Sequence, residues 1–221
     1  MKTNLKEMWR EHRMLLVLTS AIILLQMLVG VLLWDRLPDP MATHFNFHNE
    51  PDGWSSKAFA VCGMPLLLLG LHFMCLMLSC ASNIQMQNIS SRVKSLMLLI
   101  IPAVSLLVTV LCYGYALGAP FAINRIVWVF VCVLFALVGN YLPKLRRSNT
   151  TGIRLPWTLA DEEIWSRTHR FAAPVWVVCG LLMIVCGLIG SGPMIPIATI
   201  VVVIGLPIAY SLVINWKKYR A

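Results

Sequence analysis

The chain of 221 residues is 59% hydrophobic and only 12% charged, and it carries a formal net charge of +9. Ordinary soluble domains contain about 45–50% apolar and about 25% charged residues. This composition leaves too little polar surface to cover a globule, so it excludes a disordered chain, a disulfide-stapled secreted domain and a water-soluble enzyme. The apolar residues form long continuous blocks, which indicates an integral membrane protein.

Six apolar blocks have the length, or nearly the length, of about 20 residues that a helix needs to cross a bilayer. They span residues 14–33, 58–80, 95–117, 126–142, 171–190 and 194–214. The blocks lack the alternation of a membrane β-barrel, and helices satisfy their own backbone hydrogen bonds in lipid. We therefore predict an all-α integral membrane protein with six transmembrane helices, the last two joined by a turn at 191–193.

Basic residues are concentrated in alternate connections. Fifteen of the 18 lysines and arginines lie in the tail 1–13, the loop 81–94, the connection 143–170 and the tail 215–221. The positive-inside rule then places both termini in the cytoplasm and the connections 34–57 and 118–125 outside. This distribution accounts for the net charge, so we expect attraction to anionic membrane lipid and no direct nucleic-acid binding.

The predicted outer connection 34–57 is rich in proline and reads as a structured turn region. His44 and His48 are four residues apart, with Glu50 and Asp52 just beyond. On a helix this spacing would suit a zinc site. Asn46, Asn49 and Pro51 argue against a helix. We therefore favour turn capping by these side chains and keep a metal site as the alternative.

The predicted inner connection 143–170 contains a second candidate element. We predict an amphipathic helix over about 159–170, capped by Thr158, with Ile164, Trp165 and Thr168 turned towards the bilayer. On this prediction, three further side chains are available to phosphate head groups or to a protein partner: Arg167, His169 and Arg170. The alternative is a surface helix that merely links two spans.

His72 lies inside the second predicted span, and intramembrane ionisable groups are functional candidates by default. The simpler interpretation is a neutral imidazole that is hydrogen-bonded to another helix. Its candidate partners are Gln26, Ser105, Thr109 and Asn140. No predicted span contains Asp or Glu, which argues against a carboxylate proton relay, and the seven cysteines form no CxxC pair.

Two motifs resemble the SdpI family of bacterial membrane proteins. The segment LPDPMATHFNFHNEPDGWSSK is similar to the family's short N-terminal domain of unassigned function, at Pro38, His44, Phe45, Asn46, Asp52, Gly53 and Lys57. GNYLPKLRRSN, followed by GIR, PWT, W and THR, is similar to its C-terminal signature, at Gly139, Asn140, Lys144, Asn149, Gly152, Arg154, Trp157, Thr158, Trp165, Thr168 and His169. In place of a glycine that often follows the Phe-Asn pair, this chain has His48 and Asn49.

The resemblance implies a multi-pass protein of the bacterial cell membrane that protects against a membrane-active peptide toxin. In the best-known member this immunity is coupled to signalling through a cytoplasmic transcriptional repressor. The outer motif would then bind the peptide through His44, Asn46, Asp52, Gly53 and Lys57, and the signature would bind the cytoplasmic partner. We predict no cofactor and no enzymatic activity.

Two alternatives belong to other functional classes. One is a small transporter or exporter of a peptide or another substrate, which would use His72 and the proline-containing spans. The other is a membrane-embedded metalloenzyme, with His44, His48 and either Glu50 or Asp52 as metal ligands.

Overall fold

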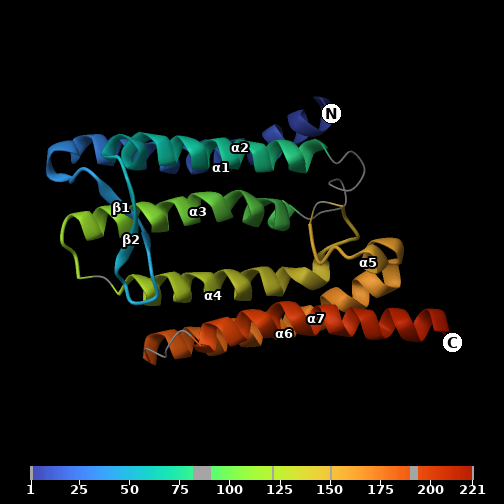
Figure 1. The fold of residues 1–221 in the computed structure, drawn as a ribbon. Helices are drawn as coiled ribbons and strands as arrows, with labels where there is room; N and C mark the ends of the chain where they lie inside the picture. Colours follow the sequence, from blue (N-terminus) through green and yellow to red (C-terminus); the bar gives the residue numbers. More distant parts are fainter. Residues whose placement is uncertain (1, 82–90, 121, 150, 190–193, 221) are drawn as a thin grey trace. The chain divides into compact units, whose positions relative to one another are not determined.

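The computed structural model describes residues 2–81, 91–120, 122–149, 151–189 and 194–220, and helices dominate it (Figure 1). Six helices in this part of the chain are long and apolar enough to cross a membrane. Many of their large apolar side chains are exposed, as expected of surfaces that face lipid. The predicted all-α multi-pass membrane fold is confirmed, while the cytoplasmic position of the termini stays a prediction.

The described residues divide into two compact units, of which the first ends at Asn124. Its three helices are α1 (Lys2–Leu32), α2 (Met64–Ala81) and α3 (Ser91–Ala116), and each packs against the other two. Pro102 is accommodated inside α3. Transmembrane helices tolerate such prolines because neighbouring groups satisfy the freed backbone atoms.

The connection between α1 and α2 contains the only strands among the described residues. The short 3₁₀ helix η1 (Trp34–Arg36) is followed by β1 (Met41–Phe45) and β2 (Pro51–Ser55), and the π-helical turn η2 (Phe59–Gly63) leads into α2. The two strands form an antiparallel hairpin at one end of the unit's helices (Figure 1). The sequence indicated turns here, and the structure adds this small sheet to the predicted fold.

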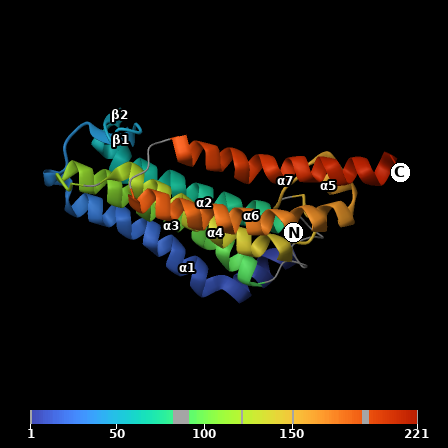
Figure 2. The ribbon, with the colours of Figure 1, turned by 90° about the horizontal axis from the view of Figure 1, so that it is seen from below.

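The second unit contains the helices that follow Arg125. Most of α4 (Ile123–Tyr141) belongs to it, together with α6 (Glu162–Ile189) and α7 (Met194–Arg220). The helices α6 and α7 pack along each other (Figures 1 and 2).

Small residues set the approach of α6 to α4. A Cβ atom built on Gly180 of α6 would lie 2.8 Å from the backbone oxygen of Cys132 in α4. In the same way, a Cβ atom built on Gly139 of α4 would lie 2.7 Å from the Cβ of Trp176 in α6. Close helix crossings of this kind are typical of membrane proteins, because glycine lets two backbones approach.

The connection before α6 differs from the predicted amphipathic helix over 159–170. The short helix α5 (Pro156–Ala160) ends before the extended residue Asp161, and α6 continues from Glu162 into the membrane span without a break. The cap of α6 is Asp161 and not Thr158, since Asp161 Oδ1 accepts the N–H groups of Glu163 and Ile164 at 2.8 and 3.2 Å.

Candidate functional site

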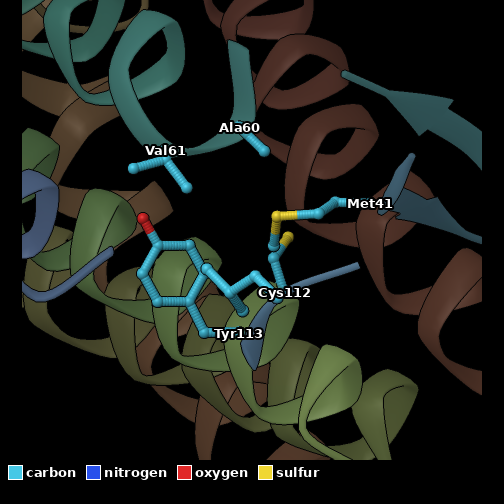
Figure 3. Packing of buried hydrophobic residues seen from close by; sticks show 6 residues of the cluster. Met41, Ala60, Val61, Cys112 and Tyr113 are labelled. Carbon is cyan, nitrogen blue, oxygen red and sulfur yellow. The ribbon is translucent and has the colours of Figure 1, made fainter. Parts of the chain in front are cut away.

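The hairpin is anchored at its base by apolar side chains. Met41 of β1 is fully buried, and Figure 3 shows it reaching towards Cys112 of α3. Together with Leu37 it belongs to a cluster completed by Ala60, Val61, Cys112 and Tyr113. Further along β1, the Phe45 ring packs edge-on against Tyr115, with 4.9 Å between the ring centroids. Both ends of β1 are therefore fixed on the helices of the first unit.

Lys57 braces the segment from its C-terminal end. Its Nζ donates hydrogen bonds to the backbone oxygens of Trp34 and Leu37 at 3.1 and 3.0 Å, and it lies 5.1 Å from the centre of the Trp34 ring. Its backbone N–H donates to Asp39 Oδ1 at 3.0 Å. Lys57, one of the predicted ligand-binding residues, thus holds the end of the connection 34–57 against its beginning at η1.

The turn of the hairpin is organised by Asn46. Its Oδ1 accepts the N–H groups of His48 and Glu50 at 2.8 and 3.0 Å, and its Nδ2 donates to Glu50 Oε2 at 3.0 Å. Asn49 adopts a left-handed conformation with φ of 65°, which asparagine tolerates better than most residues. The turn therefore forms without a glycine at this position.

The tip of the hairpin is held as well. Asn124 donates its backbone N–H to Asn49 Oδ1 at 2.8 Å and its Nδ2 hydrogens to the Phe47 carbonyl at 2.9 Å. Local sequence patterns do not predict this contact, because Asn124 lies 75 residues beyond Asn49.

The exposed face of the hairpin carries a histidine–carboxylate pair. His44 Nδ1 lies 2.5 Å from Asp52 Oδ1, and these side chains are 73% and 45% exposed. Gly53 lies opposite His44, and a Cβ atom there would come within 2.7 Å of the His44 Cβ. Gly53 therefore positions the pair by close approach, while Phe47 and Trp54 add exposed aromatic surface.

The histidines of the hairpin do not gather into a metal centre. In the part of the chain that the structure describes, no group of three or more His, Cys, Asp or Glu side chains is placed to hold a metal ion. His44 bonds Asp52, and Glu50 is bonded to Asn46 in the turn. The arrangement matches the turn-capping interpretation better than the metalloenzyme alternative.

The C-terminal signature is built around Trp165 and His169 of α6. Their rings stack with centroids 4.1 Å apart, and both residues are buried. The Ile153 N–H donates to His169 Nε2 at 2.9 Å, so the proton of a neutral imidazole resides on Nδ1, which donates to the Trp165 carbonyl at 2.8 Å. Gly152 packs against this stack with φ of 110°.

The loop before α5 is fixed by further bonds from the signature. Thr158 Oγ1 accepts the Leu155 N–H at 2.9 Å and donates to the Ile153 carbonyl at 2.8 Å. Trp165 Nε1 donates to the Leu145 carbonyl at 2.9 Å. These bonds satisfy backbone groups that no helix or strand would otherwise pair. The prediction that Ile164, Trp165 and Thr168 face the bilayer is wrong, because all three are buried and the loop covers Trp165.

The end of α7 is joined to the same region. Trp157 Nε1 donates to Ser211 Oγ at 3.0 Å. Lys218 Nζ lies 2.8 Å from Asp161 Oδ2 and 2.6 Å from Glu163 Oε2, and the Tyr219 hydroxyl donates to Asp161 Oδ2 at 2.9 Å. The Lys218 bond, aided by backbone N–H groups, holds the pKa of Asp161 below its ordinary range. We call the six residues that make these bonds the α7 latch: Trp157, Asp161, Glu163, Ser211, Lys218 and Tyr219.

Only part of the signature is exposed to a partner. Thr158, Trp165, Thr168 and His169 are buried, so they act through the shape of the loop. The exposed signature positions are Asn140, Lys144, Asn149, Gly152 and Arg154. Sequence reasoning missed the latch residues of α7, although the Asp-Glu-Glu run at 161–163 was a usable signal for both a helix start and a cationic partner.

His72 pairs with a residue that was not among its predicted partners. Its Nε2 lies 3.1 Å from Thr19 Oγ1, within the first unit. Three of the four predicted partners form a cluster of their own instead, since Ser105 and Thr109 both donate to Gln26 Oε1 at 2.7 and 2.8 Å. The interpretation of His72 as an imidazole bonded to another helix agrees with this geometry, although the identity of the partner was wrong.

Comparison with known proteins finds a match for the hairpin and a match for the C-terminal signature. The SdpI/YfhL protein family matches residues 144–211, and a domain of unknown function (DUF1648) matches residues 21–69, which include the whole hairpin. The Immunity protein SdpI of Bacillus subtilis (strain 168) is 25% identical over 193 residues, covering 87% of this chain and 91% of that protein. The predicted resemblance to the SdpI family is confirmed.

The chain is accordingly a multi-pass protein of the bacterial cell membrane. Neither the matching family nor the similar protein bears the name of an enzyme, in agreement with the prediction of no enzymatic activity. No solved structure matches the chain. The matched range 144–211 runs from Lys144 to Ser211, and so it contains both partners of the Trp157–Ser211 bond.

Proposed function

We propose that this protein protects the cell against a membrane-active peptide and that the hairpin is its peptide-binding surface. The observation that carries the proposal is the braced hairpin, which presents Asp52, Trp54 and His44 on a support fixed at base and tip. Such pre-organisation favours binding, because little conformational entropy is lost when a ligand arrives. The similarity to an immunity protein supports the same function.

In this proposal the hairpin faces outward and the signature faces the cytoplasm, as the distribution of basic residues predicts. The signature would bind a cytoplasmic partner, with a transcriptional repressor as the expected class, through its exposed residues Lys144, Asn149 and Arg154. Its buried residues would hold the loop in the shape that the partner recognises. Coupling the two surfaces requires two states of the protein to which each ligand binds differently.

The direct test is peptide protection in a sensitive bacterium that expresses this chain. We expect survival with the native protein and loss of survival with the double change His44→Ala and Asp52→Ala at equal abundance in the membrane. The control removes two exposed charges elsewhere, Lys217→Ala with Arg220→Ala, and should still protect. Failure of the native protein against every membrane-active peptide tested would contradict the proposal and favour transport.

The division between the surfaces has its own test. Changing Arg154, Trp157 and Thr158 to alanine should abolish the transcriptional response to the peptide and leave protection intact. Loss of protection at normal abundance would contradict the division.

A further inference from the structure

The strand β2 has an unpaired edge. Among the described residues the sheet has two strands, and β1 packs against α3 while β2 pairs with β1 on one side. A strand at the edge of a sheet presents backbone N–H and C=O groups that can pair with another extended chain. Peptide recognition by strand addition uses such an edge.

The hairpin is held in a way that suits this use. Met41 and Leu37 are buried at its base, Lys57 bonds the carbonyls of η1, and Asn124 bonds the tip. An isolated two-stranded hairpin is only marginally stable in water. These anchors keep β2 extended before any ligand binds, so the binding of a peptide does not carry the entropic cost of ordering β2.

The side chains of β2 indicate what would bind. Exposure alternates along the strand, with Asp52 and Trp54 exposed two residues apart. The segment 34–57 contains four acidic and two basic side chains, and the ammonium of Lys57 is already bonded to backbone carbonyls. Asp52 bonds His44 through Oδ1, and its Oδ2 can pair with a lysine or arginine. The Trp54 indole can stack with a second cation, so a carboxylate and an indole at this spacing favour a cationic strand.

The same charges disfavour a second copy of this chain as the occupant. Two hairpins that paired through β2 would bring two acidic segments together, and a charged residue on an edge strand is a common device against self-pairing. The five residues of β2 would pair with about 17 Å of an added strand.

We propose that β2 captures a cationic peptide in extended form, by adding it as a third strand of the sheet. The inference rests on the proposed function and specifies how the peptide is recognised: backbone pairing supplies the affinity, and Asp52 and Trp54 select basic residues two positions apart.

The test uses the full chain in phosphatidylcholine nanodiscs and a ten-residue peptide of alternating lysine and valine. A matched peptide carries N-methyl groups on four consecutive central residues, which blocks both of its edges and leaves its charge and side chains unchanged. We expect the dissociation constant to be at least about tenfold higher for the methylated peptide, because several backbone hydrogen bonds are lost. Empty nanodiscs correct for binding to lipid.

Photo-crosslinking locates the bound peptide. Trp54 is replaced by photoreactive benzoylphenylalanine, and Trp216 of α7, which is similarly exposed, is replaced in the same way as the control. We expect peptide adducts from position 54 and not from position 216. Equal affinity of the two peptides, no binding of either, or adducts between two protein chains without peptide would each overturn strand addition.

The two proposals fail in distinguishable ways. If the native protein protects cells but binds both peptides equally, strand addition is wrong and peptide immunity stands. If the protein neither protects cells nor binds the unmethylated peptide, both proposals are wrong.

Discussion

The hairpin and the signature contain similar polar residues but place them in opposite environments. In the hairpin, His44 and Asp52 bond each other on the surface. In the signature, His169 and Thr158 are buried and direct their hydrogen bonds to the backbone. A recognisable motif can therefore mark a surface for a ligand or an internal brace, and burial decides between the two.

Among substitutions that test this comparison, the largest effect on stability is expected at Gly152. A Cβ atom there would lie 2.6 Å from His169 Nε2 and 2.7 Å from the Trp165 ring, on a backbone with φ of 110°. We expect Gly152→Ala to lower the free energy of unfolding by about 2–4 kcal/mol, as measured on the purified protein by denaturant unfolding. Gly118→Ala has positive φ but open space, so it should cost only about 1–2 kcal/mol. Equal effects would show that packing on the stack is unimportant.

A smaller effect is expected at Thr158. The change Thr158→Val keeps the shape of the side chain but leaves the Leu155 N–H without its partner in a buried site. We expect a loss of about 1–3 kcal/mol in the same unfolding measurement. The control is Thr199→Val, which removes an exposed hydroxyl bonded within α7 and should change the free energy of unfolding by less than about 0.5 kcal/mol.

Lys57 stabilises the hairpin connection through bonds to backbone carbonyls, as Thr158 stabilises the loop of the signature. Replacing Lys57 by methionine removes two hydrogen bonds to η1, so local opening should become easier by about 1 kcal/mol. Hydrogen exchange should then accelerate several-fold in residues 34–45 and remain unchanged in α6. The change Lys217→Met on α7 serves as the control for loss of a surface lysine. Unaltered exchange in 34–45 would contradict the bracing role.

The smallest effect concerns the α7 latch and pH. Because the folded-state pKa of Asp161 is lowered, its contribution to stability is fully present above the ordinary carboxyl pKa of about 3.9 and is lost as the pH falls below it. Hydrogen exchange at the start of α6 should therefore increase below about pH 4 in the native protein. Asp161→Asn should weaken this dependence, and Glu163 should supply the remainder because it also bonds Lys218. A pH dependence unchanged by Asp161→Asn would contradict the assignment.

The membrane spans could be predicted from sequence because a bilayer demands long apolar helices and little else. The hairpin could not, since β2 contains Pro51 and Gly53, and the tip of the hairpin is held by a distant contact with Asn124. The i,i+4 spacing of His44 and His48 suggested a metal site only on a helix, and in the structure these residues lie in a strand and a turn.

The signature illustrates a different limit. Periodicity correctly placed Ile164, Trp165 and Thr168 on one face of a helix, but the face was assigned to the bilayer. In the structure the preceding loop folds over this face, with Gly152 against the rings. The covering segment has no periodicity of its own, so a local pattern could not reveal it.

The π-helical turn η2 has a consequence for insertions and deletions. It accommodates one residue more than an α-helical turn, between the hairpin and α2. Deleting a single residue from Phe59–Gly63 would let this turn relax to α-helical geometry, so the helical residues on its two sides would keep nearly the same phase. His72 would then still face Thr19. The same deletion within α2, between Met64 and His72, would rotate His72 by about 100° away from Thr19, so homologous chains should lose a residue more readily within η2 than within α2.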